Sequence, residues 1–282
     1  MADETLDKDQ EDSPSRAENA EAHATPLSPG PKQDWVDDLQ ICLMFLTRFP
    51  VPGGLAISTP SLAQASRFFP IIGVLVGVIG AIILAIADQL GVPQGASIIL
   101  AITAIVISTG GLHEDGLADT ADGLGGGSDK EHRLEIMKDS RIGAFGVLAL
   151  SLTIGLKWTG LAALSIGGAA LAIFMGAVIS RGVLPLFMRY LPLAKDDGLS
   201  ADAGQPEFDR ATISVVLTVL VAFIGLGFWL TVGLAIVLAI VTAAMAVWVK
   251  WKIGGQTGDV LGAFQQVTEI STILTIAAVG LS

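Results

Sequence analysis

Residues 68–87 read FFPIIGVLVGVIGAIILAIA, twenty residues without a single charged side chain. About 20 apolar residues in an α-helix cross the hydrocarbon core of a bilayer, so this segment predicts a transmembrane helix. The whole chain agrees, because 52% of its 282 residues are hydrophobic, only 15% are charged, and its mean hydropathy is +0.67. A soluble domain carries about 25% charged residues. The predicted fold class is therefore all-α, a polytopic transmembrane helical bundle.

The rest of the chain supports about seven spans. Residues 35–49 are apolar but too short to cross a membrane, and Pro50 ends them, so they are predicted as an N-terminal interfacial helix. Loops that carry Lys or Arg alternate with loops that carry neither, which places the N-terminus in the cytoplasm of a multi-pass inner-membrane protein. The other predicted spans are residues 96–112, 144–164, 167–186, 213–230, 231–249 and 260–281.

The first 34 residues differ from the remainder in composition. They hold nine acidic residues against three basic ones, and they contain no apolar run. We predict a disordered acidic tail over residues 1–34 and an integral membrane catalytic domain over residues 35–282. The net charge of −11 argues against nucleic acid as a partner, and the single cysteine, Cys42, excludes a disulfide scaffold.

Residues 111–127, GLHEDGLADTADGLGGG, are the richest in chemistry. Asp115, Asp119 and Asp122 are spaced i, i+4, i+7, so on a helix they share one face. Three like charges on one face need a cation, and hard oxygen ligands without cysteine favour Mg²⁺ held together with substrate phosphates. The alternative is a solvated acidic face. Gly, Ala and Leu rather than Lys separate these acids, which favours the metal–diphosphate site.

Five other side chains are candidates for the same site or for a plainer role. His113 is a general base, a ligand or a helix-start residue without a role. Arg141, with Lys138 nearby, opens a span at a helix N-terminus, where phosphate binds, or it anchors the span in the cytoplasm. Arg181 and Lys157 lie within spans, so each is either functional or reaches to the membrane surface.

Two acids belong to a last polar cluster, residues 254–269. Asp259 begins the final span, where a helix cap explains an acid as readily as a substrate or second metal ligand does. Glu269 lies deeper in the same span, and we expect it to face the interior of the bundle.

The polar motifs follow a fixed order: HEDGLADTADGL (113–124), DSRIGAFG (139–146), SR (180–181) and GGQTGDVLGAFQQVTE (254–269). In this order they resemble the cobalamin synthase family, the adenosylcobinamide-GDP ribazoletransferases. The resemblance runs from about residue 38 to the C-terminus and includes FLTRFPVP (45–52) and FFPIIGVLVG (68–77). The family usually has a hydrophobic residue in place of Glu114, so we do not expect Glu114 to be an essential ligand.

The resemblance implies a reaction and its participants. The hydroxyl of α-ribazole, or of its 5′-phosphate, attacks the cobinamide-bearing phosphorus of adenosylcobinamide-GDP. GMP leaves, and adenosylcobalamin or its 5′-phosphate forms, with Mg²⁺ required. This is the late nucleotide-loop assembly step of vitamin B12 biosynthesis. The implied roles are metal and catalytic residues Asp115, Asp119 and Asp122, a catalytic His113, and substrate or phosphate contacts Arg141, Arg181, Lys138, Asp259 and Glu269.

Other activities remain open at this point. A CDP-alcohol phosphotransferase also has an aspartate-rich helix in a membrane bundle, but its acids are more widely spread and an Arg follows the first of them. An ion-coupled transporter would carry acids at span midpoints, whereas the main cluster here is predicted in a basic cytoplasmic loop. The expected surroundings are membrane lipids facing an active site on the cytoplasmic side, and a homo-oligomer is left open.

Overall fold

Helices form the regular structure of this protein in a computed structural model that describes residues 35–51, 62–195 and 203–280. Within those ranges the chain has no strand, only one isolated bridge between Leu193 and Gln256. The predicted all-α membrane fold class is confirmed. The predicted disordered tail, residues 1–34, lies outside the described residues. The described residues all belong to the unit Trp35–Ser282.

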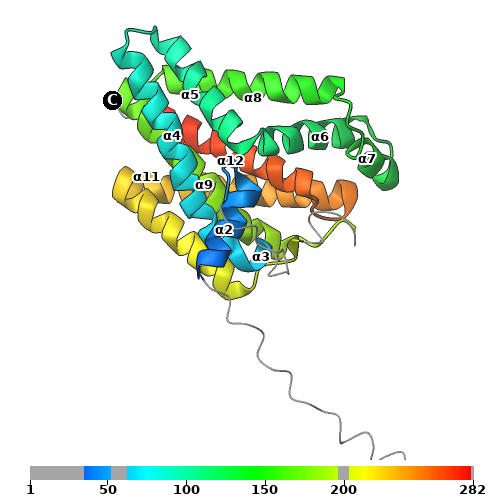
Figure 1. The fold of residues 1–282 in the computed structure, drawn as a ribbon. Coiled ribbons are helices and arrows are strands. Elements are labelled where there is room, and N and C mark those ends of the chain that lie inside the picture. The colour runs from blue at the N-terminus through cyan, green and yellow to red at the C-terminus, as the bar shows by residue number, and fades with distance from the viewer. Residues whose placement is uncertain (1–34, 52–61, 196–202, 281–282) are drawn as a thin grey trace, which may run out of the picture. The chain divides into compact units, whose positions relative to one another are not determined.

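The helices are shown in Figure 1 and follow one another with short connections. They are α2 (Trp35–Leu46), α3 (Leu62–Ala65), the 3₁₀ helix η1 (Ser66–Phe68), α4 (Phe69–Gln89), α5 (Gln94–Thr109), α6 (Leu112–Gly126), α7 (Lys130–Ile136), α8 (Ala144–Ala162), α9 (Ile166–Tyr190), α11 (Phe208–Ile253) and α12 (Gly258–Val279).

Five helical segments in the described part of the chain are long and apolar enough to cross a membrane. A sixth candidate is α5 taken together with α6, two helices that meet at an angle of 89°. The predicted number of seven spans is not confirmed and stays a prediction. The five segments are Leu62–Gln89, α8, α9, α11 and α12.

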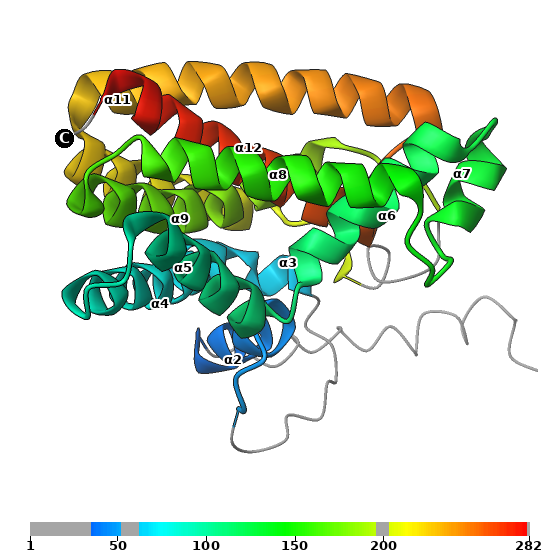
Figure 2. The ribbon, with the colours of Figure 1, turned by 90° about the horizontal axis from the view of Figure 1, so that it is seen from above.

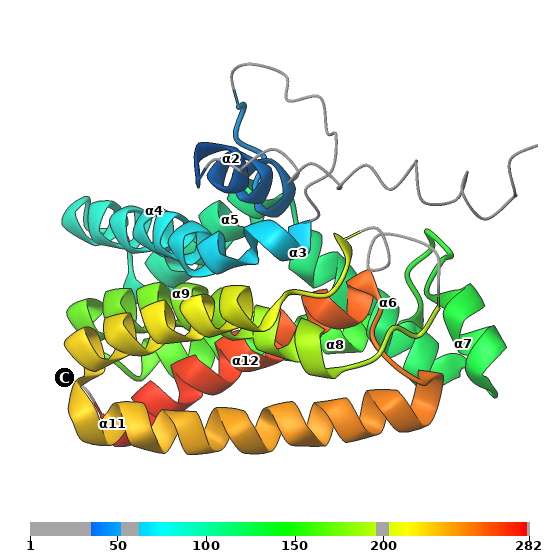
Figure 3. The ribbon, with the colours of Figure 1, turned by 90° about the horizontal axis from the view of Figure 1, so that it is seen from below.

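α11 is the longest of these helices, and it does not run straight. Its 46 residues would extend roughly 70 Å, more than twice the hydrocarbon core of about 30 Å. Gly227 interrupts it with non-helical backbone angles (φ 72°, ψ 175°), and Figure 3 shows the chain turning back within α11. Residues 208–226 and 228–253 are therefore two separate arms.

Burial separates the inner helices from the lipid-facing ones. α9 and α12 bury 78% and 72% of their apolar windows, whereas α8 and α11 bury only 28% and 22%. An apolar helix that stays exposed on most of its surface must face lipid rather than water. α12 lies between α8 and α11 (Figure 2) and packs against both. The polar residues of α9 and α12 thus lie in the interior of the bundle.

α2 is fastened to the bundle by a buried ion pair. Arg67 of η1 donates a hydrogen bond to Asp38 at 2.6 Å, and its guanidinium lies over the rings of Trp35 and Phe68. The predicted helix over residues 35–49 is therefore present as α2. Its place at the membrane surface stays a prediction.

Candidate functional site

The acidic segment is a helix, as its spacing predicted, but it is not part of a loop outside the bundle. Gly110 and Gly111 both have positive φ values, 67° and 70°, a conformation that glycine adopts without strain. They turn the chain by 89° and direct α6 back against α8 and α12. Hydropathy alone predicts that the preceding span ends at Leu112, because the acids of α6 lower the mean hydropathy of the residues that follow.

α6 and α12 cross in backbone contact at two glycines. A Cβ atom on Gly116 would lie 2.8 Å from the carbonyl oxygen of Asp259 and 3.2 Å from the Cα of Gly262. A Cβ on Gly262 would in turn lie 3.3 Å from the Cα of His113. Only glycine allows two helices this close an approach. The crossing places the first turn of α12 beside the acidic motif.

Three carboxylates gather beside this crossing. Asp119 experiences the negative charge of Asp115 on its own helix and of Asp259 on α12. Asp119 and Asp259 are half-buried, and Asp115 is exposed. Within the described residues, no hydrogen bond or ion pair engages the carboxylates of Asp115 and Asp119. The sequence predicted Asp115, Asp119 and Asp122 on one helix face, with Asp259 as a substrate or second metal ligand. The structure brings Asp259 next to Asp115 and Asp119.

Asp122 has a different neighbour. Its carboxylate accepts a hydrogen bond from the backbone N–H of Gly143 at 2.7 Å and another from that of Gly146 at 2.9 Å. Both donors belong to the start of α8, and Asp122 is only 7% exposed. The motif DSRIGAFG therefore meets the acidic helix through Asp122.

The donor set matches a hard divalent cation that substrate helps to bind. In the described ranges no three His, Cys, Asp or Glu side chains are close enough to hold a metal by themselves. Mg²⁺ usually takes only one or two protein carboxylates and completes its shell with water and phosphate. Carboxylates that repel one another and lack protein partners, such as Asp115 and Asp119, fit that kind of site.

A buried polar network lies below the acids, toward the middle of the bundle. Lys157 of α8 donates a hydrogen bond to Gln266 at 2.8 Å and lies 3.3 Å from a carboxylate oxygen of Glu269. Gln266 donates in turn to Glu114 at 3.0 Å. The network joins α6, α8 and α12, and it offsets the charges of its members inside a medium that solvates ions poorly.

Arg181 is part of the same interior. It is 1% exposed, and it donates a hydrogen bond to the carbonyl of Ala177 one turn earlier on α9. Glu269 and Glu114 supply the negative charge around it. Arg181 is therefore an interior residue and does not reach to the membrane surface.

His113 is also buried, at the start of α6. Both of its ring nitrogens lack a hydrogen-bond partner among the described residues. Arg181 and Lys157 are the charged groups that act on it. The side chain lies on the interior side of the acidic motif rather than with the half-exposed carboxylates.

Arg141 and Lys138 lie at the outer end of the site, and both are exposed. Arg141 donates hydrogen bonds to Asp139 from its side chain and from its backbone N–H. These bonds lower the pKa of the Asp139 carboxyl to about 2, so Asp139 stays ionised at neutral pH. The Arg141 side chain is 87% exposed, but its Nε and Nη2 groups already donate to Asp139, so Nη1 is the part that carries no bond to Asp139.

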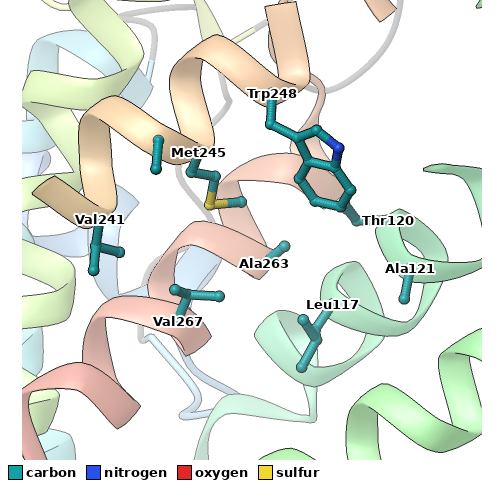
Figure 4. A pocket seen from close by; sticks show the side chains of 9 residues that line it. Leu117, Thr120, Ala121, Val241, Met245, Trp248, Ala263 and Val267 are labelled. Carbon is teal, nitrogen blue, oxygen red and sulfur yellow. The ribbon is translucent and has the colours of Figure 1, made fainter. Parts of the chain in front are cut away.

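An apolar cleft lies along the other face of α6 (Figure 4). Its volume is about 450 Å³, and α11 and α12 form its other walls. Thr120 contributes a hydroxyl without a hydrogen-bond partner among the described residues. Leu117, Thr120 and Ala121 share this face by their i, i+3, i+4 spacing, so α6 presents acids on one side and apolar groups on another.

The structure thus brings the predicted residues into two groups. The outer group contains Asp115, Asp119, Asp122 and Asp259, and the inner group contains His113, Arg181 and Glu269. Arg141 and Lys138 lie on the connection between α7 and α8, which meets the outer group through the bond from Gly143 to Asp122.

Sequence reasoning missed Lys195, and it missed the partner of Lys157. Lys195 acts electrostatically on Asp259. From the sequence, it was used only as one of the basic loop residues that predict the orientation in the membrane. Lys157 is paired with Glu269, a contact across 112 positions of the chain that no local spacing reveals. Its only sequence signal was a cation inside a span.

Comparisons with known proteins agree with the motifs. The family model described as cobalamin-5-phosphate synthase matches residues 38–277. The protein named adenosylcobinamide-GDP ribazoletransferase from Mesorhizobium japonicum is 44% identical over 248 residues, 88% of this chain and 95% of that protein. Proteins of the same name from Bradyrhizobium diazoefficiens and Shewanella piezotolerans are 41% and 39% identical, over 86% and 89% of this chain and 94% and 99% of their own.

No solved structure matches the chain. The family match covers the helices that build both groups of site residues. It decides among the classes of activity that the motifs left open, against a phospholipid-forming phosphotransferase and against a transporter. The chain belongs to the cobalamin-5-phosphate synthase family.

Proposed function

We propose that this protein transfers the phosphocobinamide group of adenosylcobinamide-GDP to α-ribazole or its 5′-phosphate and releases GMP. The observation that carries the proposal is the α6–α12 crossing, which gathers Asp115, Asp119 and Asp259, with Lys195 acting on Asp259. Relatives that share about 40% of its residues over most of their length carry the name of this activity. The site and the names thus support one reaction.

The reaction is a substitution at phosphorus. A bond forms between a ribazole hydroxyl oxygen and the cobinamide-bearing phosphorus, and the bond from that phosphorus to the bridging oxygen of the diphosphate breaks. The hydroxyl proton leaves to a base, and GMP carries away the bridging oxygen with its negative charge. The protein must therefore hold a diphosphate, accept a proton and stabilise a phosphate leaving group.

Asp115 and Asp119 are the proposed ligands of Mg²⁺, with Asp259 facing them from α12. When bound, Mg²⁺ neutralises phosphate charge and stabilises the attacking and leaving oxygens. The half-exposed Asp119 is the better placed of the candidate bases, because His113 is enclosed on the inner side. Arg141 and Lys195 supply positive charge at the rim for the leaving phosphate, and Arg181 supplies it from within.

We also propose that the site faces the cytoplasm of a cell inner membrane. α7, which carries Lys130 and Arg133, and the connection between α11 and α12, which follows Lys250 and Lys252, lie at one end of the bundle. The C-terminus and the connection between α8 and α9 lie at the other end (Figures 2 and 3). The positive-inside rule supports the cytoplasm at the basic end, which is also the end of the acidic cluster.

The direct test uses the purified full-length protein in detergent. It is incubated with adenosylcobinamide-GDP and α-ribazole, with Mg²⁺ or with a chelator, and GMP and the corrinoid product are measured. We expect both products in equal amounts with Mg²⁺ and neither with the chelator. Asp119→Asn, which keeps the volume and removes the charge, serves as the site control and should abolish transfer. The absence of GMP with either ribazole form would refute the proposal.

A further inference from the structure

The three aspartates of the acidic motif do not share one environment. Asp115 and Asp119 face Asp259 of α12 and have no hydrogen-bond partners among the described residues. Asp122 instead faces α8, where two backbone N–H groups are bonded to its carboxylate. All three acids belong to α6, but Asp115 and Asp119 face α12 and Asp122 faces α8.

The environment of Asp122 leaves little room for a metal ion. A Cβ atom on Gly143 or Gly146 would overlap the Asp122 carboxylate, and a Cβ on Gly146 would also lie 3.1 Å from the Ala118 carbonyl. The two glycines thus enclose the carboxylate closely, and the residue is 7% exposed. Its negative charge is already matched by the N-terminal end of α8, where anions are favoured.

The outer half of α6 also needs an attachment. The inner half is fixed to α12 by the Gly116–Gly262 crossing and by the hydrogen bond from Gln266 to Glu114. Beyond Asp122 the helix continues with Gly123, Leu124 and two more glycines, a sequence with weak intrinsic preference for the helix. Among the described residues, the two bonds to α8 are the side-chain hydrogen bonds that attach this half, while Met137 and Phe145 pack against its glycines.

We propose that Asp122 is a positioning residue: it fixes α6 to the first turn of α8 so that Asp115 and Asp119 face the substrate diphosphate. It is not itself a metal ligand. The inference rests on the proposed function for the identity of the substrate, but not for the assignment of Asp122, because metal binding can be measured without turnover.

The experiment compares Asp122→Asn with Asp119→Asn in the full-length protein in detergent. Binding of Mn²⁺, used as the probe ion, is followed by electron paramagnetic resonance, and kcat and KM are measured with Mg²⁺. For Asp122→Asn we expect about tenfold to 100-fold lower kcat, with the Mn²⁺ dissociation constant and KM changed less than about threefold. Asp119→Asn should weaken Mn²⁺ binding about 30-fold or more, because a carboxylate ligand is lost.

A second variant moves Asp122 without changing any acid. Gly146→Ala places a methyl group against the carboxylate and should reproduce the fall in kcat with Mn²⁺ binding kept. The matched control is Gly155→Ala on the same helix, whose Cβ would meet no atom within 4 Å and should leave both readouts unchanged.

Two outcomes would overturn the assignment. Mn²⁺ binding that weakens in Asp122→Asn as much as in Asp119→Asn would make Asp122 a ligand. A kcat within about twofold of the wild type in both Asp122→Asn and Gly146→Ala would remove the positioning role. If all variants bind Mn²⁺ as expected while even the wild type makes no GMP, the proposed function fails and the assignment of Asp122 as a non-ligand stands.

Discussion

Arg141 and Arg181, two arginines that the sequence placed in one role, occupy opposite environments. Arg141 is paired with the partly exposed Asp139 at the rim, and Arg181 of α9 is enclosed beside the acids of the inner network. Lysine can replace an exposed point charge, but it lacks the planar fork of arginine and is harder to remove from water. The same substitution should therefore have different consequences at the two positions.

We expect Arg181→Lys to lower kcat/KM about 100-fold or more and Arg141→Lys to lower it about tenfold. Each factor of ten corresponds to about 1.4 kcal/mol of activation free energy. The measurement is steady-state transfer at saturating Mg²⁺. A near-normal Arg181→Lys beside a severe Arg141→Lys would show that the inner arginine has no part in the reaction. The acidic cluster would be unaffected by that result.

Lys157 provides a test of the inner network. Lys157→Met leaves Glu269 buried without its nearest cation, and breaking a buried pair in this way costs about 3–5 kcal/mol. Adding Glu269→Gln restores the charge balance, because Arg181 then faces Glu114 alone. Thermal unfolding in detergent should show the double variant to be more stable than Lys157→Met. A double variant no more stable than the single one would contradict this account of the pair.

At the level of elements, the sequence predicted the helical character of α6 but not its location. The spacing of Asp115, Asp119 and Asp122 correctly predicted a helix, and spans near α4, α8, α9 and α12 followed from hydropathy. Hydropathy could not show that an acidic helix turns back into the bundle. That depends on Gly262, which lies on a helix far along the chain and opens the space for Gly116.

The same limit explains which site residues were found. Acids and an intramembrane arginine are conspicuous in an apolar sequence, so Asp119, Arg181 and Glu269 could be named from composition and spacing alone. The partners of these residues could not, because Lys157–Glu269 and Asp122–Gly143 are contacts between distant helices. Local periodicity contains no information about which helices meet.

The glycine crossing makes an element-level prediction. Gly116→Ala places a Cβ 2.8 Å from a backbone oxygen of α12, so the helices must separate, at a cost of about 1–3 kcal/mol. Asp259 then moves away from Asp115 and Asp119, and we expect activity to fall about tenfold or more. Thermal unfolding and GMP release check both effects. Gly155→Ala is the control, because its Cβ would meet no atom within 4 Å. If Gly116→Ala unfolds and releases GMP as Gly155→Ala does, α6 and α12 are not in close contact at Gly116.

The orientation of the protein in the membrane is open to a direct test. With Cys42 replaced by Ala, a cysteine at Ser128 should react with an impermeant maleimide only from the cytoplasmic side, and a cysteine at Gly91 only from the opposite side. Both positions are exposed at turns, and the positive-inside rule sets the expected sides. Labelling of position 128 from outside intact cells would reverse the proposed orientation of the acidic cluster.

The reversal at Gly227 gives the site an order of assembly during biosynthesis. Everything before it supplies Asp115, Asp119, Lys157 and Arg181, while the final hairpin, the second arm of α11 with α12, supplies Asp259, Gln266 and Glu269. A ribosome makes the chain from the N-terminus, so Lys157 and Arg181 are translated before Glu269, and only Glu114 of the acids around Arg181 precedes them. A nascent chain that terminates at the reversal has one acid fewer than cations in its inner network, and it lacks the Asp259 that faces Asp115 and Asp119.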